Sequence, residues 1–277
     1  MSTLTVWSLN GGRFVGNTPH EEPQTLKWLK GLSEPGATVP DVLCLQDFRV
    51  SLLQYLQPLP HFCFVAMANH KIWGKRELWG ICIASRYPLN DIAVHYTWGD
   101  GIIRNLEGVG DDNERIGSGN IVDPLVLRSL NWAAVACSVC KPGDPAPWRI
   151  ATHHGFWVRG GNSSPEQMRS TDSLCGFLAE QGRRHGGIVY TADCNPDKEG
   201  MVLRRYAESD GRDCLPQDVK TTLAEHHPAA KLGIKADHIM IWPDKDGKFT
   251  YDVTNVYVDP SPGSDHLMLC STVSRHL

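Results

Sequence analysis

The sequence lacks a hydrophobic run long enough to cross a lipid bilayer, and it lacks an excess of charge of either sign. Lys and Arg total 27 against 31 Asp and Glu, which gives a formal net charge of −4. That balance does not draw nucleic acid to the whole surface, although a local basic rim is compatible with it. Residues 1–7 enter a strand pattern at once, with no basic leader and no cleavage site. These absences predict a cytoplasmic protein with no membrane anchor and no secretion signal.

Internal repeats, low-complexity tracts and linkers are also absent, so we expect one domain over residues 1–277. The composition, 41% hydrophobic and 21% charged, is typical of a globular protein. Several of the nine cysteines lie in strand-like runs, where buried thiols behave as small hydrophobes. Cys137 and Cys140 form a lone C-x-x-C. Because positions three apart on a strand face opposite sides, we expect no zinc or redox site there.

Short strand-like runs dominate the chain, and helices are few. Helices are expected over 25–32 and after Ser164, where the order Ser-Pro-Glu-Gln supplies an N-cap, a Pro at N1 and a Gln at N3. Residues 71–79 are predicted to be a basic and aromatic connector, 97–120 a long surface loop, and the stretch through 228 irregular. Strands are expected over 4–10, 40–47, 63–67, 80–84, 131–139, 148–152, 187–193, 235–242, 249–258 and 267–273. The excess of expected strands over expected helices predicts stacked sheets with helices outside.

The stretch from Val189 to Pro196 organises the rest of the chain. An apolar, β-prone run ends in Asp193, which is followed by Cys194, Asn195 and a proline. Residues two apart on a strand face the same way, so Asp193 and Asn195 can both project into a cleft at the strand end. On this stretch alone, a strand followed by an ordinary turn is the more common explanation.

The ends of other predicted strands carry side chains of the same chemical kind, and this favours a shared site. Carboxylates and an amide are ligands that Mg²⁺ accepts, imidazoles suit phosphate oxygens, and an Asp–His pair fixes the tautomer of its ring. The residues are Asn10, Asp47, the pair His153 and His154, Asp193 with Asn195, and Asp265 with His266, together with Asp237 at the start of a strand.

The order of these motifs resembles the endonuclease/exonuclease/phosphatase superfamily over essentially the whole chain, and most of all its uncharacterised bacterial branch. The matching segments are 7–12, 41–47, 80–88, 152–157, 192–195, 236–239 and 264–266, with 164–168 after the fourth. The resemblance implies an α/β (α+β) four-layered sandwich of two packed mixed β-sheets flanked by helices, the DNase I-like architecture. It also implies hydrolysis of phosphoesters that depends on Mg²⁺ or Mn²⁺, with the site at the top of the sandwich.

Carried over position by position, the resemblance assigns roles to eleven residues. Asp193 stands at the general base, Asn195 at its phosphate-binding partner, and Asp237 at the carboxylate that orients the last histidine, His266. The upstream histidine falls on His154 if the His-Gly-x-Trp match governs, and on His153 otherwise. Asn10, Asp47 and Asp265 stand at metal ligands, and Ser8 and Trp157 at substrate contacts.

Two positions depart from the family pattern. Asp47 stands where the family has Glu and is one methylene shorter, and Ser8 stands where the first strand usually has Asn. Since Mg²⁺ demands near-ideal geometry, these changes bear most directly on metal affinity.

The function predicted is therefore a phosphodiesterase or nuclease, acting as a monomer on a phosphate-ester substrate, with nucleic acid among the candidates. A phosphomonoesterase of nucleotides, inositols or lipids is the alternative within the same chemistry. A catalytically weakened binding module of the same fold is the alternative outside it.

Overall fold

Two mixed β-sheets form the centre of the molecule. The computed structural model describes residues 2–12, 20–72, 75–109, 130–243 and 249–276. One sheet has seven strands in the order β12-β13-β1-β2-β4-β3-β6, and the other has six in the order β10-β11-β9-β8-β7-β5. Both are mixed, because β1 pairs in parallel with β2 in the first sheet and β8 in parallel with β9 in the second.

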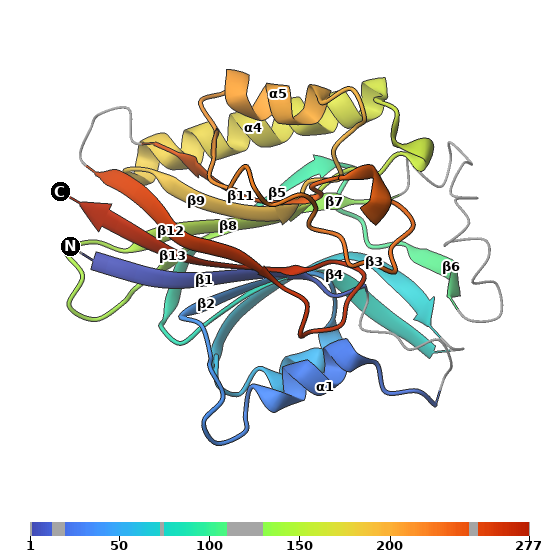
Figure 1. Ribbon diagram of the computed structural model, residues 1–277, viewed down its shortest axis with the longest axis horizontal. Coiled ribbons are helices and arrows are strands. Elements are labelled where there is room, and N and C mark those ends of the chain that lie inside the picture. The colour runs from blue at the N-terminus through green and yellow to red at the C-terminus, as the bar shows by residue number, and fades with distance from the viewer. Residues whose placement is uncertain (1, 13–19, 73–74, 110–129, 244–248, 277) are drawn as a thin grey trace.

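The strands of the first sheet are β1 (Ser2–Asn10), β2 (Val42–Arg49), β3 (His61–Ile72), β4 (Lys75–Ser85), β6 (Asn105–Val109), β12 (Thr250–Asp259) and β13 (Met268–His276). Those of the second are β5 (Leu89–Trp98), β7 (Trp132–Val139), β8 (Trp148–His154), β9 (Ile188–Asp193), β10 (Arg212–Asp213) and β11 (Asp237–Trp242). The amino-terminal strand β1 lies beside the carboxy-terminal strand β13, so the two ends of the chain are neighbours in one sheet (Figure 1).

Helices cover the outer faces of both sheets, which makes four layers (Figure 1). Helix α1 (Gln24–Gly31) covers the first sheet, while α4 (Pro165–His185) and α5 (Met201–Glu208) cover the second. Helix α4 begins as the sequence predicts, because the Ser164 side chain accepts a hydrogen bond from the Gln167 backbone N–H at 3.1 Å. It ends at Gly186, whose φ of 74° suits a residue without a side chain. Short 3₁₀ helices lie at η2 (Val50–Tyr55), η3 (Arg159–Gly161) and η4 (Ala230–Leu232).

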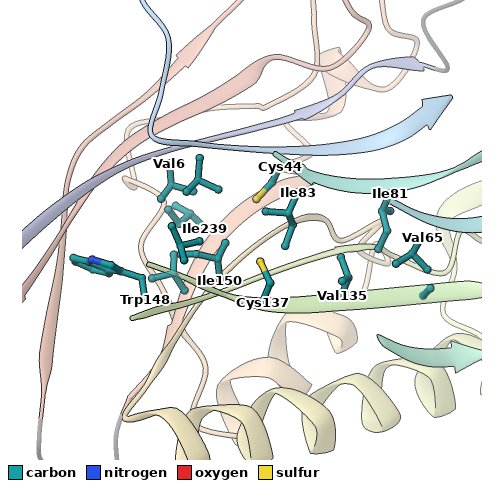
Figure 2. Packing of buried hydrophobic residues seen from close by; sticks show 14 of the residues in the cluster. Val6, Cys44, Val65, Ile81, Ile83, Val135, Cys137, Trp148, Ile150 and Ile239 are labelled. Atoms are coloured by element: carbon teal, nitrogen blue, oxygen red, sulfur yellow. The ribbon is translucent and has the colours of Figure 1, made fainter. Parts of the chain in front are cut away.

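The core between the sheets is made of side chains that alternate inward from both. Figure 2 shows Val6, Cys44 and Ile83 of the first sheet facing Cys137, Ile150 and Ile239 of the second. All of these are at most 1% exposed, as expected for inner faces of a β-sandwich. Two further clusters bury α1 and α4 against the outer faces. The four-layered α/β sandwich expected from the sequence is therefore confirmed.

The prediction of a connector over residues 71–79 is wrong. Strands β3 and β4 continue through it and pair as far as Ile72 with Lys75, while residues 73–74 lie outside the described part of the chain. Its last residue, Trp79, is only 5% exposed and therefore belongs to the core. Backbone pairing with β3 extends the hairpin through basic residues whose apolar pattern is weak.

Strand β5 was not expected from the sequence, and neither were three shorter elements. Strand β6 lies within the region predicted as a loop over 97–120, of which residues 110–129 lie outside the described residues. Helix α5 and strand β10 lie in the stretch predicted to be irregular. All three are short, and short elements carry too little periodicity to stand out in a sequence.

All nine cysteines are free thiols, and within the described residues no helix is both long and apolar enough to span a membrane. One domain over residues 1–277 stays a prediction.

Candidate active site

Asp193 lies at the centre of the site. It is the last residue of β9, and it is 1% exposed. One carboxylate oxygen, Oδ1, accepts a hydrogen bond from the Asn195 backbone N–H at 2.9 Å. The other, Oδ2, accepts one from Asn10 Nδ2 at 2.8 Å, across the two sheets. Donors from both sides therefore hold this buried carboxylate in one orientation.

Two Asp–His pairs converge on the same oxygen of Asp193. His154 contacts Asp47 Oδ1 through Nδ1 at 2.9 Å and Asp193 Oδ2 through Nε2 at 3.5 Å. His266 contacts Asp237 Oδ2 through Nδ1 at 2.9 Å and Asp193 Oδ2 through Nε2 at 3.8 Å. Each ring is thus oriented by a carboxylate behind it and presents Nε2 to the centre. We call this arrangement the double dyad.

The upstream half of the double dyad depends on a β-bulge. The register between β2 and β4 shifts between Leu45 and Phe48, and Asp47 has a φ of 53° within that shift. The strand does not end at Asp47, as the sequence suggested, but continues to Arg49. A bulge re-aims a side chain, and here it turns the Asp47 carboxylate to His154.

The downstream half is tied to the loop that follows β10. The buried Thr222 hydroxyl accepts hydrogen bonds from the Ala236 and Asp237 backbone N–H groups at 2.8 and 2.9 Å, which fixes the start of β11. Leu223 forms an isolated antiparallel bridge with His266, and the Leu267 N–H donates to the Thr222 carbonyl at 2.7 Å. The two residues of this dyad therefore share one support.

Asn195 is held at the mouth of the site by a close approach of two strand ends. A side chain at Gly155 would meet the Cys194 carbonyl oxygen at 2.3 Å, so only glycine fits there. The Asn195 amide donates to the Gly155 carbonyl at 3.0 Å and keeps a second N–H for another acceptor. Gln167, at the start of α4, donates to the carbonyls of Phe156 and Asn195 at 3.0 and 2.9 Å.

Charge in the double dyad favours protonated histidines. Burial alone would lower the pKa of His266, but the carboxylates of Asp237 and Asp193 raise it to about 10. Burial likewise opposes the charge of His154, and Asp47 and Asp193 raise its pKa above the ordinary value. Two imidazolium N–H groups beside one carboxylate can bind the oxygens of a phosphate.

His153 lies outside the double dyad. It alternates with His154 on β8 and therefore faces the layer of α4, where Nε2 lies 3.1 Å from the Thr97 hydroxyl and Nδ1 lies 3.5 Å from that of Tyr190. Burial, together with His154 and His95, holds its pKa well below the ordinary value. The geometry brings His154, and not His153, to the other candidate residues.

The remaining candidates take different positions. Ser8 is 2% exposed and accepts a hydrogen bond from Gln46 Nε2 at 3.1 Å, which also donates to Thr152 between the sheets. Its hydroxyl therefore belongs to a buried network. Trp157 is 36% exposed and lines a cavity that also contains His266 and Asn195.

The structure adds residues that sequence reasoning missed. His227 lies near His266, with ring centroids 5.9 Å apart. Trp79 and Trp132 pack edge-on against His154 at 5.9 and 5.1 Å and shield it from water. The only sequence signal for His227 is the pair His226-His227 before a proline, and Trp79 fell in the presumed connector.

The donor chemistry fits a divalent cation. Ligand atoms of Asp193, Asp237 and His266 lie within 4.8 Å of one another, and so do those of His227, Asp265 and His266. A side chain at Gly12 would lie 3.0 Å from Asp265 Oδ1, so glycine keeps space open beside that carboxylate. With Asn10, these residues offer the oxygen donors that Mg²⁺ and Mn²⁺ accept. Asp47 faces His154 with one of its oxygens.

Comparisons with known proteins show what this arrangement is similar to. No family model and no curated protein sequence matches the chain. Solved structures do. An endonuclease/exonuclease/phosphatase from Beutenbergia cavernae superposes with a TM-score of 0.65 at 14% identity, covering 98% of this chain and 71% of that one. The chain has the endonuclease/exonuclease/phosphatase fold.

Two other solved structures with this fold are a Nocturnin catalytic domain and a mannosyl-6-phosphatase. The catalytic domain of human Nocturnin, with a bound sulfate anion, matches with a TM-score of 0.60 at 16% identity, over 99% of this chain and 95% of that one. A mannosyl-6-phosphatase from Bacteroides thetaiotaomicron matches with a TM-score of 0.58 at 14% identity, over 99% and 100%. The endonuclease/exonuclease/phosphatase resemblance seen in the sequence motifs is thus confirmed for the fold.

Proposed function

We propose that this protein is a metal-dependent phosphoester hydrolase, and a phosphodiesterase or nuclease in the first instance. The observation that carries the proposal is the double dyad, in which two oriented imidazole rings present Nε2 to one side of the buried Asp193 carboxylate. Endonuclease/exonuclease/phosphatase neighbours of the same fold support it.

The residues take the following roles in the proposal. His154 and His266, both protonated, donate to the oxygens of the phosphate, and Asn195 adds the second N–H of its amide. Asp193 orients the attacking water and accepts its proton. Asp47 and Asp237 hold the rings in position through Nδ1.

Asn10 and Asp265 would hold the divalent cation, Mg²⁺ or Mn²⁺. When bound, the ion neutralises charge on the phosphate oxygens. Asp47, the third metal ligand expected from the sequence, serves the His154 ring in this proposal.

Substituting Asp193 tests the function directly. Asp193→Asn keeps the shape but removes the acceptor of the water proton, so we expect turnover of bis(p-nitrophenyl) phosphate to fall by roughly three orders of magnitude or more. His266→Ala should cause a loss of similar size. The assay is run with Mg²⁺ or Mn²⁺, and EDTA should abolish wild-type activity. Wild-type turnover by Asp193→Asn would refute the assignment.

The same assay separates the alternatives. Faster release of p-nitrophenol from p-nitrophenyl phosphate than from the diester would favour a phosphomonoesterase of nucleotides, inositols or lipids. Binding of Mn²⁺ measured by calorimetry, without hydrolysis of either ester, would favour a binding module. The double dyad favours an active enzyme, because a pure binder has no need of two carboxylate-oriented rings around a third carboxylate.

A further inference from the structure

A cavity of about 480 Å³ opens directly beside His266. Its lining includes the polar side chains of His266, Asn195 and His227. Its apolar lining includes Trp157 from the segment after β8, and Leu223, Leu232 and Ile234 from the segment between β10 and β11. The cavity therefore joins the proposed phosphate site to an apolar surface.

Backbone hydrogen bonds tie the segments that line this cavity to one another and to the site. The Lys198 N–H donates to the Gly161 carbonyl at 2.7 Å, and the Ala224 N–H donates to the Asp265 carbonyl at 2.8 Å. The second bond joins the Leu223 side of the cavity to the segment that carries His266. Cavities that are already formed in this way bind small organic groups at a lower entropic cost.

Two large apolar side chains that line the cavity are exposed to solvent. Leu232 is 67% exposed and Trp157 is 36% exposed. Among the described side chains that line the cavity, Lys198 is the only Lys, Arg, Asp or Glu. A groove for a nucleic-acid backbone needs several cations for several phosphates, and the described lining supplies one.

We propose that the cavity is a subsite for a compact apolar or aromatic group carried by the phosphate ester. This inference rests on the proposed function and names the substrate class, namely esters with one phosphate and a ring or short hydrocarbon beside it. His227 supplies a polar contact between the two parts. Its Nδ1 accepts the Ala229 N–H at 3.0 Å, so the neutral ring carries its hydrogen on Nε2 and donates from there.

The test compares two diesters that share a leaving group. Ethyl p-nitrophenyl phosphate and phenyl p-nitrophenyl phosphate both release p-nitrophenol, but only the second brings a ring to the cavity. We expect kcat/KM to be about tenfold higher for the phenyl ester, mainly through a lower KM, because burial of the additional apolar surface contributes to binding. A thymidine 5′-p-nitrophenyl ester distinguishes a nucleoside from a simple aryl group as the source of the ring.

Two variants assign the preference to the cavity. Leu232→Asp puts a charge on the apolar rim, and Trp157→Ala removes the exposed indole. Each should bring the phenyl-to-ethyl ratio close to one, and Leu232→Asp should leave the rate on the ethyl ester unchanged. The matched control is Ile92→Asp, on an exposed β5 side chain that does not line the cavity, and it should keep the wild-type ratio.

The outcomes separate the two proposals. Equal kcat/KM for the ethyl and phenyl esters in the wild type, or an unchanged preference in both cavity variants, overturns the subsite while the hydrolase stands. Failure of the wild type to hydrolyse any of the three diesters, with Mg²⁺ or Mn²⁺ present, overturns the phosphodiesterase proposal itself.

Discussion

Two adjacent histidines on β8 have opposite environments, and the alternation of the strand is the cause. His154 lies between Asp47 and Asp193, whose charges raise its pKa. His153 lies beside the Thr97 and Tyr190 hydroxyls on the other face, where burial lowers its pKa. Neither property can be obtained from the dipeptide itself, because it depends on which face of the strand meets the other sheet.

This difference predicts how the two rings respond to substitution. His154→Gln should reduce turnover at least about a hundredfold, because the ring that contacts the substrate is lost. His153→Gln should keep turnover within a few-fold of the wild type. The assay on the diester, together with circular dichroism to confirm folding, checks both. A loss confined to His153→Gln would place the reacting histidine on the other face.

His153 should also make stability depend on pH. The folded protein holds this ring neutral, so below the ordinary histidine pKa of about 6.5 the unfolded chain binds a proton that the folded chain does not. The free energy of unfolding should therefore fall as pH drops through that value. Urea titrations of the wild type and His153→Gln between pH 7.5 and 5 should show a smaller decrease in the variant; equal slopes would contradict the neutral ring.

At the scale of elements, the loop after β10 supports the site without containing a proposed reacting group. Thr222→Val keeps the volume but leaves the N–H groups of Ala236 and Asp237 without their acceptor. Buried donors without partners cost roughly 1–3 kcal/mol each, so we expect a marked loss of stability and weaker positioning of Asp237. Thr254→Val, at an exposed position of β12, is the control and should change the free energy of unfolding little. Chemical denaturation measures both variants.

The elements also show which parts of the site could be predicted from the sequence. Strand ends at Asn10, Asp193 and His154 were visible because a short apolar run followed by polar residues is a local pattern. The bulge at Asp47 was not, because it depends on pairing between β2 and β4, which are separated along the chain. Trp79 and His227 reach the site through tertiary contacts alone, so no local spacing indicates them.

At the scale of the whole molecule, the interface between the sheets carries the stability on which the site depends. Ile150 is fully buried there, among side chains of both sheets. Ile150→Ala should lower the free energy of unfolding by about 2–5 kcal/mol, since it removes buried methylenes and leaves a cavity. Ile92→Ala, which is 50% exposed, should lower it by less than about 0.5 kcal/mol. Guanidinium denaturation gives both values, and similar losses at the two positions would contradict this account of the core.

The fold also limits what its neighbours say about substrate. Structures at 14–16% identity share the sandwich while one is described as a mannosyl-6-phosphatase and another as a Nocturnin catalytic domain. The scaffold therefore does not select the ester, and selection falls to the segments around its rim. A monomeric and cytoplasmic protein stays a prediction that sedimentation and cell fractionation can check.

The bridge between Leu223 and His266 has a consequence for motion. One side of the bridge lines the proposed subsite and the other bears a ring of the double dyad, so the two segments must open together if either opens. Occupancy of the apolar cavity would then slow the exchange of the Ala224 and Leu267 amide hydrogens with solvent deuterium. A molecule that fills the cavity would in this way make the His266 ring more rigid. Substrate binding in the cavity and the positioning of this histidine would then depend on one cooperative unit.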